Sequence, residues 1–140
     1  MSNSGEKRIS PSQPIWRGKH WLVEHAYPCG MKGWLVLLPD RHVHAIHELT
    51  NEEMEEFSEI FFRLPKALHN LLDTEKEYVM QLAVGEGFTH VHFHIVAKPK
   101  NLLKKYEGIK IFALKNDVKS LSKEEIKKFC KLMREELING

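Results

Sequence analysis

Residues 87–100 read GFTHVHFHIVAKPK, and this stretch holds a third of the nine histidines of the chain. These histidines stand at alternate positions: His90, His92 and His94. The residues between them, Val91 and Phe93, are apolar. Because successive side chains of a β-strand point to opposite faces, the pattern predicts a strand over residues 89–96. We expect imidazoles on one face of this strand and an apolar, core-facing surface on the other.

Imidazoles that share a strand face favour either of two kinds of chemistry. Imidazole binds zinc, copper and iron, so the histidines are candidate metal ligands, and His42 and His44 are candidates to complete the coordination shell. A neutral imidazole is also a nucleophile and a proton carrier near neutral pH. One histidine can therefore attack phosphorus while its neighbours stabilise the phosphoryl oxygens. The residues alone leave both alternatives open.

Other segments of the chain predict more strands. Apolar runs that end at turn residues lie at residues 21–26, 33–38 and 77–84. Gly85, Glu86 and Gly87 then predict a hairpin that leads into the histidine strand.

Two capping boxes predict helices. Thr50 is followed by Glu53, and Ser122 by Glu125, in the spacing that satisfies the first backbone N–H groups of a helix. The expected core-facing stripe of the first helix is Met54, Phe57, Phe61, Leu64, Leu68 and Leu71, and that of the second is Ile126, Phe129, Met133 and Leu137. Pro65 removes a backbone donor and predicts a bend in the first helix.

Hairpins with separate helices, and no βαβ alternation, predict the α+β class with an antiparallel sheet covered by helices. At 140 residues we expect a single domain over residues 16–140 and a flexible polar tail over residues 1–15. A formal net charge of +2 does not favour nucleic-acid binding, and no apolar run is long enough to predict a membrane span. Cys29 and Cys130 form no CxxC pair, which favours reduced thiols in a cytoplasmic protein.

Lysines are concentrated after the histidine strand. They are Lys98, Lys100, Lys104, Lys105 and Lys110. Such a cluster is either a solvated face or a positive rim that attracts an anionic ligand. Composition does not choose between the two.

The run His90-Val-His92-Phe-His94-Ile-Val resembles the signature of the histidine triad (HIT) superfamily of nucleotide hydrolases and transferases. The upstream segment GWLVLLPDRHVHAIHELTNEE, residues 33–53, is similar to a second part of the family pattern. That part is a strand ending in proline, a basic-His-Val step and a Leu-Thr-x-Glu-Glu helix start. The two matches lie in the expected order, and with the strand at residues 77–84 they cover residues 20–100.

This resemblance implies a HIT-like fold of about five antiparallel strands, a long central helix and a C-terminal helix, commonly as a homodimer. It implies that His92 attacks the α-phosphorus of a nucleotide derivative and that His90, His94 and His42 line the phosphate site. Gln81 is the nearest polar equivalent of an asparagine that members often carry on the preceding strand. No cofactor or metal is obligatory in this scheme.

We therefore expect a nucleotidyl hydrolase or transferase that works through a nucleotidyl-histidine intermediate. Its expected substrate is a dinucleoside polyphosphate or a nucleoside phosphoramidate, cleaved at the α-phosphate linkage. Two alternatives are a HIT-fold protein that binds nucleotide with little turnover and a zinc protein that uses the triad as ligands.

The sequence departs from the family pattern in the substrate-contacting positions. Glu86 stands near the place of a glutamine that touches phosphate in many members, and a glutamate there repels phosphate unless it points away or is protonated. An acidic residue that holds ribose in many members is replaced near Ala26. The usual Pro-Arg after the triad reads Ala97-Lys98-Pro99.

Two stretches have no counterpart in the pattern. Residues 106–121 have no assigned role, and KIFALKN at residues 110–116 alternates in part, which predicts an extra strand. His44 and His47 are expected to be surface residues at the entry to the first helix.

Overall fold

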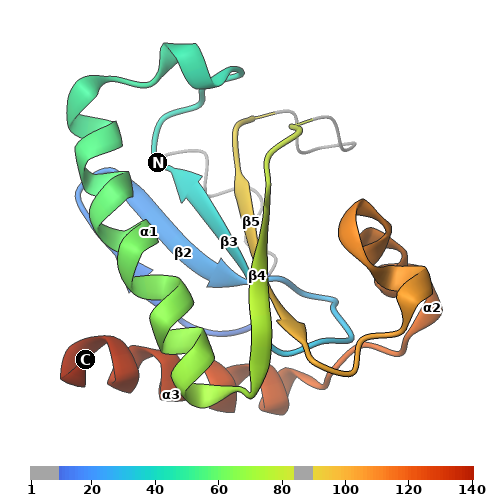
Figure 1. The fold of residues 1–140 in the computed structure, drawn as a ribbon. Helices are drawn as coiled ribbons and strands as arrows, with labels where there is room; N and C mark the ends of the chain where they lie inside the picture. Colours follow the sequence, from blue (N-terminus) through green and yellow to red (C-terminus); the bar gives the residue numbers. More distant parts are fainter. Residues whose placement is uncertain (1–9, 84–89) are drawn as a thin grey trace.

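A five-stranded antiparallel sheet forms the centre of the molecule in the computed structural model, which describes residues 10–83 and 90–140 (Figure 1). Its strands are β1 (Trp16–Arg17), β2 (Trp21–His25), β3 (Trp34–Pro39), β4 (Thr74–Met80) and β5 (Phe93–Pro99). They lie in the order β1-β2-β3-β5-β4, and every neighbouring pair is antiparallel. The predicted α+β class and five-stranded HIT-like sheet are confirmed.

Strand β5 is shorter than the alternation of histidines predicts. It begins at Phe93, so His94 lies within the strand while His90 and His92 precede it. The backbone N–H of Val91 instead donates to the carbonyl of Val43 at 2.8 Å, which holds this approach against the loop after β3. Strand β4 likewise ends before the predicted limit at residue 84, and the predicted turn at Gly85, Glu86 and Gly87 lies outside the described residues.

One face of the sheet is covered by the two long helices (Figure 1). Helix α1 (Asn51–Leu71) begins at the capping box formed by Thr50 and Glu53, and it continues past Pro65 without ending. Its buried side is turned slightly from the predicted stripe, because Ile60 and Ala67 are buried while Met54 is exposed. At the N-terminal end of the helix the buried position is Glu53 instead of Met54.

Helix α3 (Lys123–Asn139) agrees with its prediction. Ser122 caps it with Glu125, and its buried face is Ile126, Phe129, Cys130, Met133 and Leu137. These side chains pack with those of α1, β2, β3 and β5 into the larger core cluster. Ile15 also belongs to this cluster, so the packed part of the described chain starts before residue 16.

The opposite face of the sheet is covered by a helical segment that follows β5, here called the post-triad segment, residues 104–117. It consists of the short 3₁₀ helices η3 (Lys104–Tyr106) and η4 (Gly108–Ala113) and the single turn α2 (Leu114–Asp117). The extra strand predicted from KIFALKN is therefore wrong. Ile111 and Leu114 are both buried, and their spacing of three residues suits a helical turn.

The loop that carries His42 is tied to the start of α1 by a charged pair. The Nε of Arg41 donates to Oε2 of Glu53 at 2.8 Å, and its Nη2 donates to Oε1 at 2.9 Å. The Arg41 guanidinium holds the pKa of the buried Glu53 carboxyl at about 2, below its ordinary value of 4.5. A bidentate pair of this kind fixes orientation as well as distance.

We predict that the Arg41–Glu53 pair makes the free energy of unfolding depend on pH. The folded-state pKa of Glu53 is depressed, so its contribution is complete above about pH 4.5 and is lost as the pH falls towards about 2. Glu53→Gln should lower the free energy of unfolding by roughly 1.5–3 kcal/mol at pH 7. The deficit should shrink in urea titrations at successively lower pH. The exposed neighbour variant Glu52→Gln is the control, and an equal loss in both variants would contradict the role of Glu53.

Candidate active site

The hydrogen bond that His92 makes determines which of its ring nitrogens carries the proton. Nδ1 of His92 lies 2.8 Å from the backbone carbonyl oxygen of His90. A carbonyl can only accept, so Nδ1 must carry the proton in this contact. In the neutral ring, Nε2 is then left with its lone pair. His92 is thus presented in the tautomer that a nucleophile requires.

His94 is held in the opposite tautomer. The indole Nε1–H of Trp34 donates to Nδ1 of His94 at 2.9 Å, and an indole nitrogen can only donate. Nδ1 of His94 is therefore the acceptor, and the proton of the neutral ring lies on Nε2. The rings of His92 and His94 are 5.0 Å apart between centroids and nearly perpendicular. An unprotonated nitrogen and an N–H group thus belong to adjacent imidazoles.

Burial keeps His94 neutral. Burial is the largest cause, and together with the nearby His92 and Lys115 it lowers the pKa of His94 from 6.5 to about 3. The Trp34 hydrogen bond acts the same way, since a doubly protonated ring would set one N–H against another. At neutral pH His94 is therefore an uncharged hydrogen-bond donor through Nε2.

Gln81 meets the triad through the backbone. Its Oε1 lies 3.4 Å from the backbone N–H of His92, which donates to it. Gln81 follows the end of β4, so this contact joins that edge strand to the residue before β5. The structure thus brings Gln81 to the backbone of His92.

A second group of imidazoles lies beside the triad. The rings of His42 and His90 are 4.1 Å apart, and those of His44 and His90 are 5.0 Å apart. The Val91–Val43 backbone hydrogen bond explains the proximity, because Val43 lies between the two loop histidines. His44 is exposed as expected of a surface residue. It also lies next to His90, near the triad histidines with which the metal-binding interpretation grouped it.

His25 is a buried histidine of a different kind. Its Nδ1–H donates to the Ala26 carbonyl at 2.8 Å, and its Nε2 accepts from the Gly33 N–H at 3.0 Å. Burial lowers its pKa to about 4, and its ring packs edge-on against Phe129 of α3. Both nitrogens are used in closing the β2–β3 connection, so His25 is structural.

Two lysines of the predicted positive rim have carboxylate partners. Nζ of Lys98 lies 2.6 Å from Oε1 of Glu75, and Nζ of Lys100 lies 2.9 Å from Oδ1 of Asp73. The first of these pairs links the side chains of β5 and β4. For these two lysines the rim hypothesis is weakened, because their charges are already balanced.

Residues 10–83 and 90–140, which the structure describes, contain no group of three or more His, Cys, Asp or Glu side chains arranged to hold a metal ion. None of their helices combines the length and apolarity required to cross a bilayer. Cys29 and Cys130 are buried free thiols, as predicted. Glu86, whose charge was expected to bear on phosphate binding, lies outside the described residues.

Comparisons with solved structures agree with this architecture. A histidine triad protein of Sinorhizobium meliloti superposes with a TM-score of 0.76 at 17% identity, over 97% of this chain and 96% of that one. A histidine triad protein of Bradyrhizobium japonicum gives a TM-score of 0.74 at 16% identity, over 91% of each chain. The diadenosine triphosphate hydrolase of Plasmodium falciparum gives 0.67 at 15% identity, over 90% of this chain and 76% of that one. At these identities the likeness establishes the fold.

The family of the chain is identified by comparison of its sequence. No curated protein matches it. The family model described as the HIT domain, however, matches residues 8–101, a range that includes β1 to β5 and all the triad histidines. The chain therefore belongs to the HIT domain family.

Proposed function

We propose that this protein is a nucleotidyl hydrolase or transferase that cleaves the α-phosphate linkage of a nucleoside phosphate derivative. The observation that carries the proposal is the pair of opposite tautomers, with an Nε2 lone pair on His92 beside an Nε2–H on His94. One nitrogen is suited to attack phosphorus, and the other to donate to a phosphoryl oxygen. Two identical tautomers would offer only one of these functions.

In the first step, Nε2 of His92 forms a bond to the α-phosphorus. The bond from phosphorus to the leaving group breaks, and the leaving group departs with its electron pair. The phosphorylated imidazole becomes cationic, and its Nδ1–H stays on the His90 carbonyl, which stabilises that charge. His94 donates through Nε2 to a phosphoryl oxygen as negative charge develops there.

In the second step, water attacks the phosphorus of the nucleotidyl-histidine. The N–P bond breaks, its electrons return to Nε2 of His92, and the water proton passes to solvent. The product is a nucleoside monophosphate, and the free imidazole is regenerated. In a transferase an acceptor nucleophile takes the place of water.

The comparisons support this choice of chemistry at the level of the family. The superposed Plasmodium protein is a diadenosine triphosphate hydrolase. We assign His90 and His42, whose ring centroids lie 4.1 Å apart, to the same phosphate site, with Gln81 positioning His92 through its backbone. The scheme uses the residues of this chain alone and requires no obligatory cofactor.

We predict that His92→Ala removes both the covalent adduct and most of the rate. Rapid quenching of wild-type protein with diadenosine triphosphate should trap a nucleotide on the protein through an acid-labile, base-stable phosphoramidate bond. His92→Ala should show no adduct and a loss of several orders of magnitude in kcat. His94→Ala should retain more activity, because loss of one electrostatic donor costs roughly 10²–10³.

An adduct that persists in His92→Ala would rule out this mechanism. Turnover that stops with a chelator and returns with zinc would instead favour the metal alternative. Nucleotide binding without turnover in the wild-type protein would favour the alternative of a binding protein. The control for loss of an imidazole outside the triad is His47→Ala. His47 is an exposed histidine in the connection between β3 and α1.

We also predict the tautomers directly. Nitrogen-15 NMR spectra at pH 7 should show His94 as a neutral ring protonated on Nε2, and it should remain neutral at pH 5 because its pKa is about 3. Trp34→Phe removes the donor to Nδ1, so the tautomer preference of His94 should weaken and its pKa should rise. A cationic His94 at pH 5 in the wild-type protein would contradict the assignment.

A homodimer is proposed for the assembly. Strand β4 ends the sheet, and an edge strand offers unpaired backbone groups to a second copy. Val79 on this strand is 45% exposed. Sedimentation should give twice the 16.4 kDa mass of the chain, and Val79→Asp should shift the equilibrium towards monomer. A wild-type protein that sediments as a monomer at micromolar concentration would contradict the proposal.

A further inference from the structure

The post-triad segment places one aromatic side chain, Phe112, against the triad. The ring of Phe112 lies 5.2 Å from that of His94 and 5.5 Å from that of Trp34, edge-on in both cases. His94 and Trp34 also meet edge-on at 5.9 Å. The Phe112 ring therefore contacts both partners of the hydrogen bond that sets the His94 tautomer. Phe112 lies beyond residue 101, where the match to the HIT family model ends.

Lys115 is carried to the same place by the turn α2. Its Nζ lies 5.4 Å from the centroid of the Trp34 ring and 5.8 Å from that of Phe112. A cation over an aromatic face is attracted by the ring quadrupole, which favours this position for the ammonium group. Its charge reaches the triad, because it contributes to lowering the pKa of His94.

The backbone around Lys115 is anchored at several points. Leu114 is buried against the sheet, and the hydroxyl of Tyr106 donates to Oδ2 of Asp117 at 3.0 Å. After the segment, the N–H of Leu121 donates to the Cys29 carbonyl at 2.8 Å. These contacts hold α2 against the connection between β2 and β3. Lys115 therefore occupies a fixed part of the structure.

The charge of Lys115 is not neutralised by a carboxylate within residues 10–83 and 90–140. Its neighbour in α2, Asp117, is engaged by Tyr106. Lys98 and Lys100, by contrast, are each paired with an acidic side chain. An exposed ammonium that is held beside the triad and has no carboxylate partner among the described residues is suited to bind an anion supplied by a ligand.

We propose that Lys115 is a substrate-binding residue that takes a phosphate of the leaving group, so that the preferred substrate is a nucleoside polyphosphate rather than a nucleoside phosphoramidate with a neutral amine. This inference rests on the proposed function, because a leaving group has meaning only if His92 attacks the α-phosphorus. The reacting phosphate already has a donor in Nε2–H of His94. Lys115 stands over the Trp34 and Phe112 rings that contact His94, and its charge acts on His94, so we assign a second phosphate of an extended substrate to its ammonium group.

The experiment compares ligands that differ in the leaving group. Turnover of diadenosine triphosphate and of adenosine 5′-phosphoramidate is measured for the wild type and for Lys115→Met, which keeps the side-chain length but removes the charge. Loss of one charge-assisted hydrogen bond should raise KM for diadenosine triphosphate about tenfold, with kcat changed less. Kinetics with the phosphoramidate should be unchanged.

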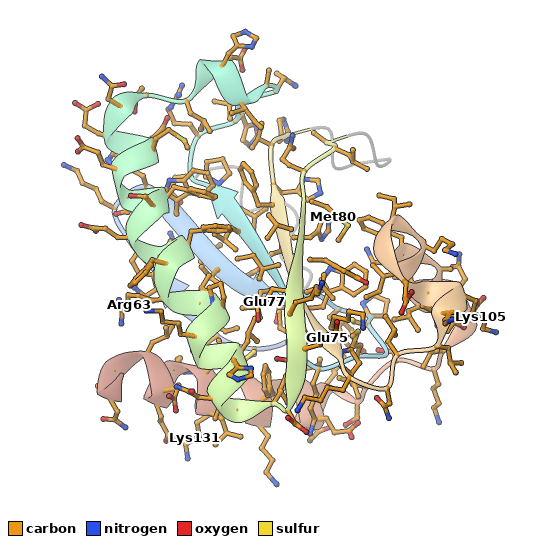
Figure 2. All side chains as sticks on the ribbon, viewed as in Figure 1. Arg63, Glu75, Glu77, Met80, Lys105 and Lys131 are labelled. Atoms are coloured by element: carbon orange, nitrogen blue, oxygen red, sulfur yellow. The ribbon has the colours of Figure 1, made fainter. Side chains whose placement is uncertain are left out.

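Calorimetric titrations make the test independent of turnover. Lys115→Met should weaken ADP about tenfold and leave AMP affinity unchanged, because only ADP carries a phosphate beyond the α position. The matched control is Lys105→Met. Lys105 belongs to the same segment and lies 5.1 Å from the Tyr106 ring, but Figure 2 shows it at the outer edge of the molecule. Lys105→Met should behave as the wild type with every ligand.

The outcomes separate the two proposals. A wild type that turns over neither substrate but shows the ADP-specific loss in Lys115→Met would refute the catalytic function and keep Lys115 as a phosphate-binding residue. Equal losses for ADP and AMP would place Lys115 at the reacting phosphate and overturn the leaving-group assignment. No loss for either ligand, or the same loss in Lys105→Met, would overturn the role of Lys115 altogether. Melting curves of both variants should match the wild type, since both lysines are exposed.

Discussion

The antiparallel pairing of β3 with β5 is the constraint on which the site depends. In this register Trp34 stands opposite Val96 and Val36 opposite His94. Trp34 and His94 are therefore diagonal neighbours on one face, close enough for the indole to reach the imidazole. A register shift by one residue would turn His94 towards the helices and separate it from Trp34. The tautomer of His94 is thus a consequence of strand pairing.

Much of the fold could be predicted because its signals are local. The capping boxes at Thr50 and Ser122, and the apolar stripe of α3, involve residues close in sequence, and each was found where expected. The same local reasoning failed for η4, since a short partly alternating segment does not distinguish a strand from a 3₁₀ turn. Strand β5 also begins later than predicted. The backbone hydrogen bond between Val91 and Val43 joins residues that are distant in sequence, so local patterns could not reveal it.

The candidate site could be predicted only in part, for the same reason. The alternation of histidines identifies the triad, and its apolar neighbours indicate which side faces the core. No pattern in the sequence joins Trp34 to His94 across 60 residues, or brings Lys115 to the rings of Trp34 and Phe112. The lysines that did stand out near the triad include two that are paired with acidic residues. Proximity in sequence to the histidines was therefore a poor guide to which cation faces them.

The charges around the proposed nucleophile follow a simple requirement. Attack on phosphorus makes the His92 ring cationic, so a second imidazolium beside it would oppose the step by like-charge repulsion. Burial and the Trp34 hydrogen bond keep His94 neutral while leaving it a donor. Positive charge for a polyphosphate must then come from a group farther from His92. Lys115 meets that condition, because its ammonium group lies over the rings of Trp34 and Phe112 while its charge still acts on His94.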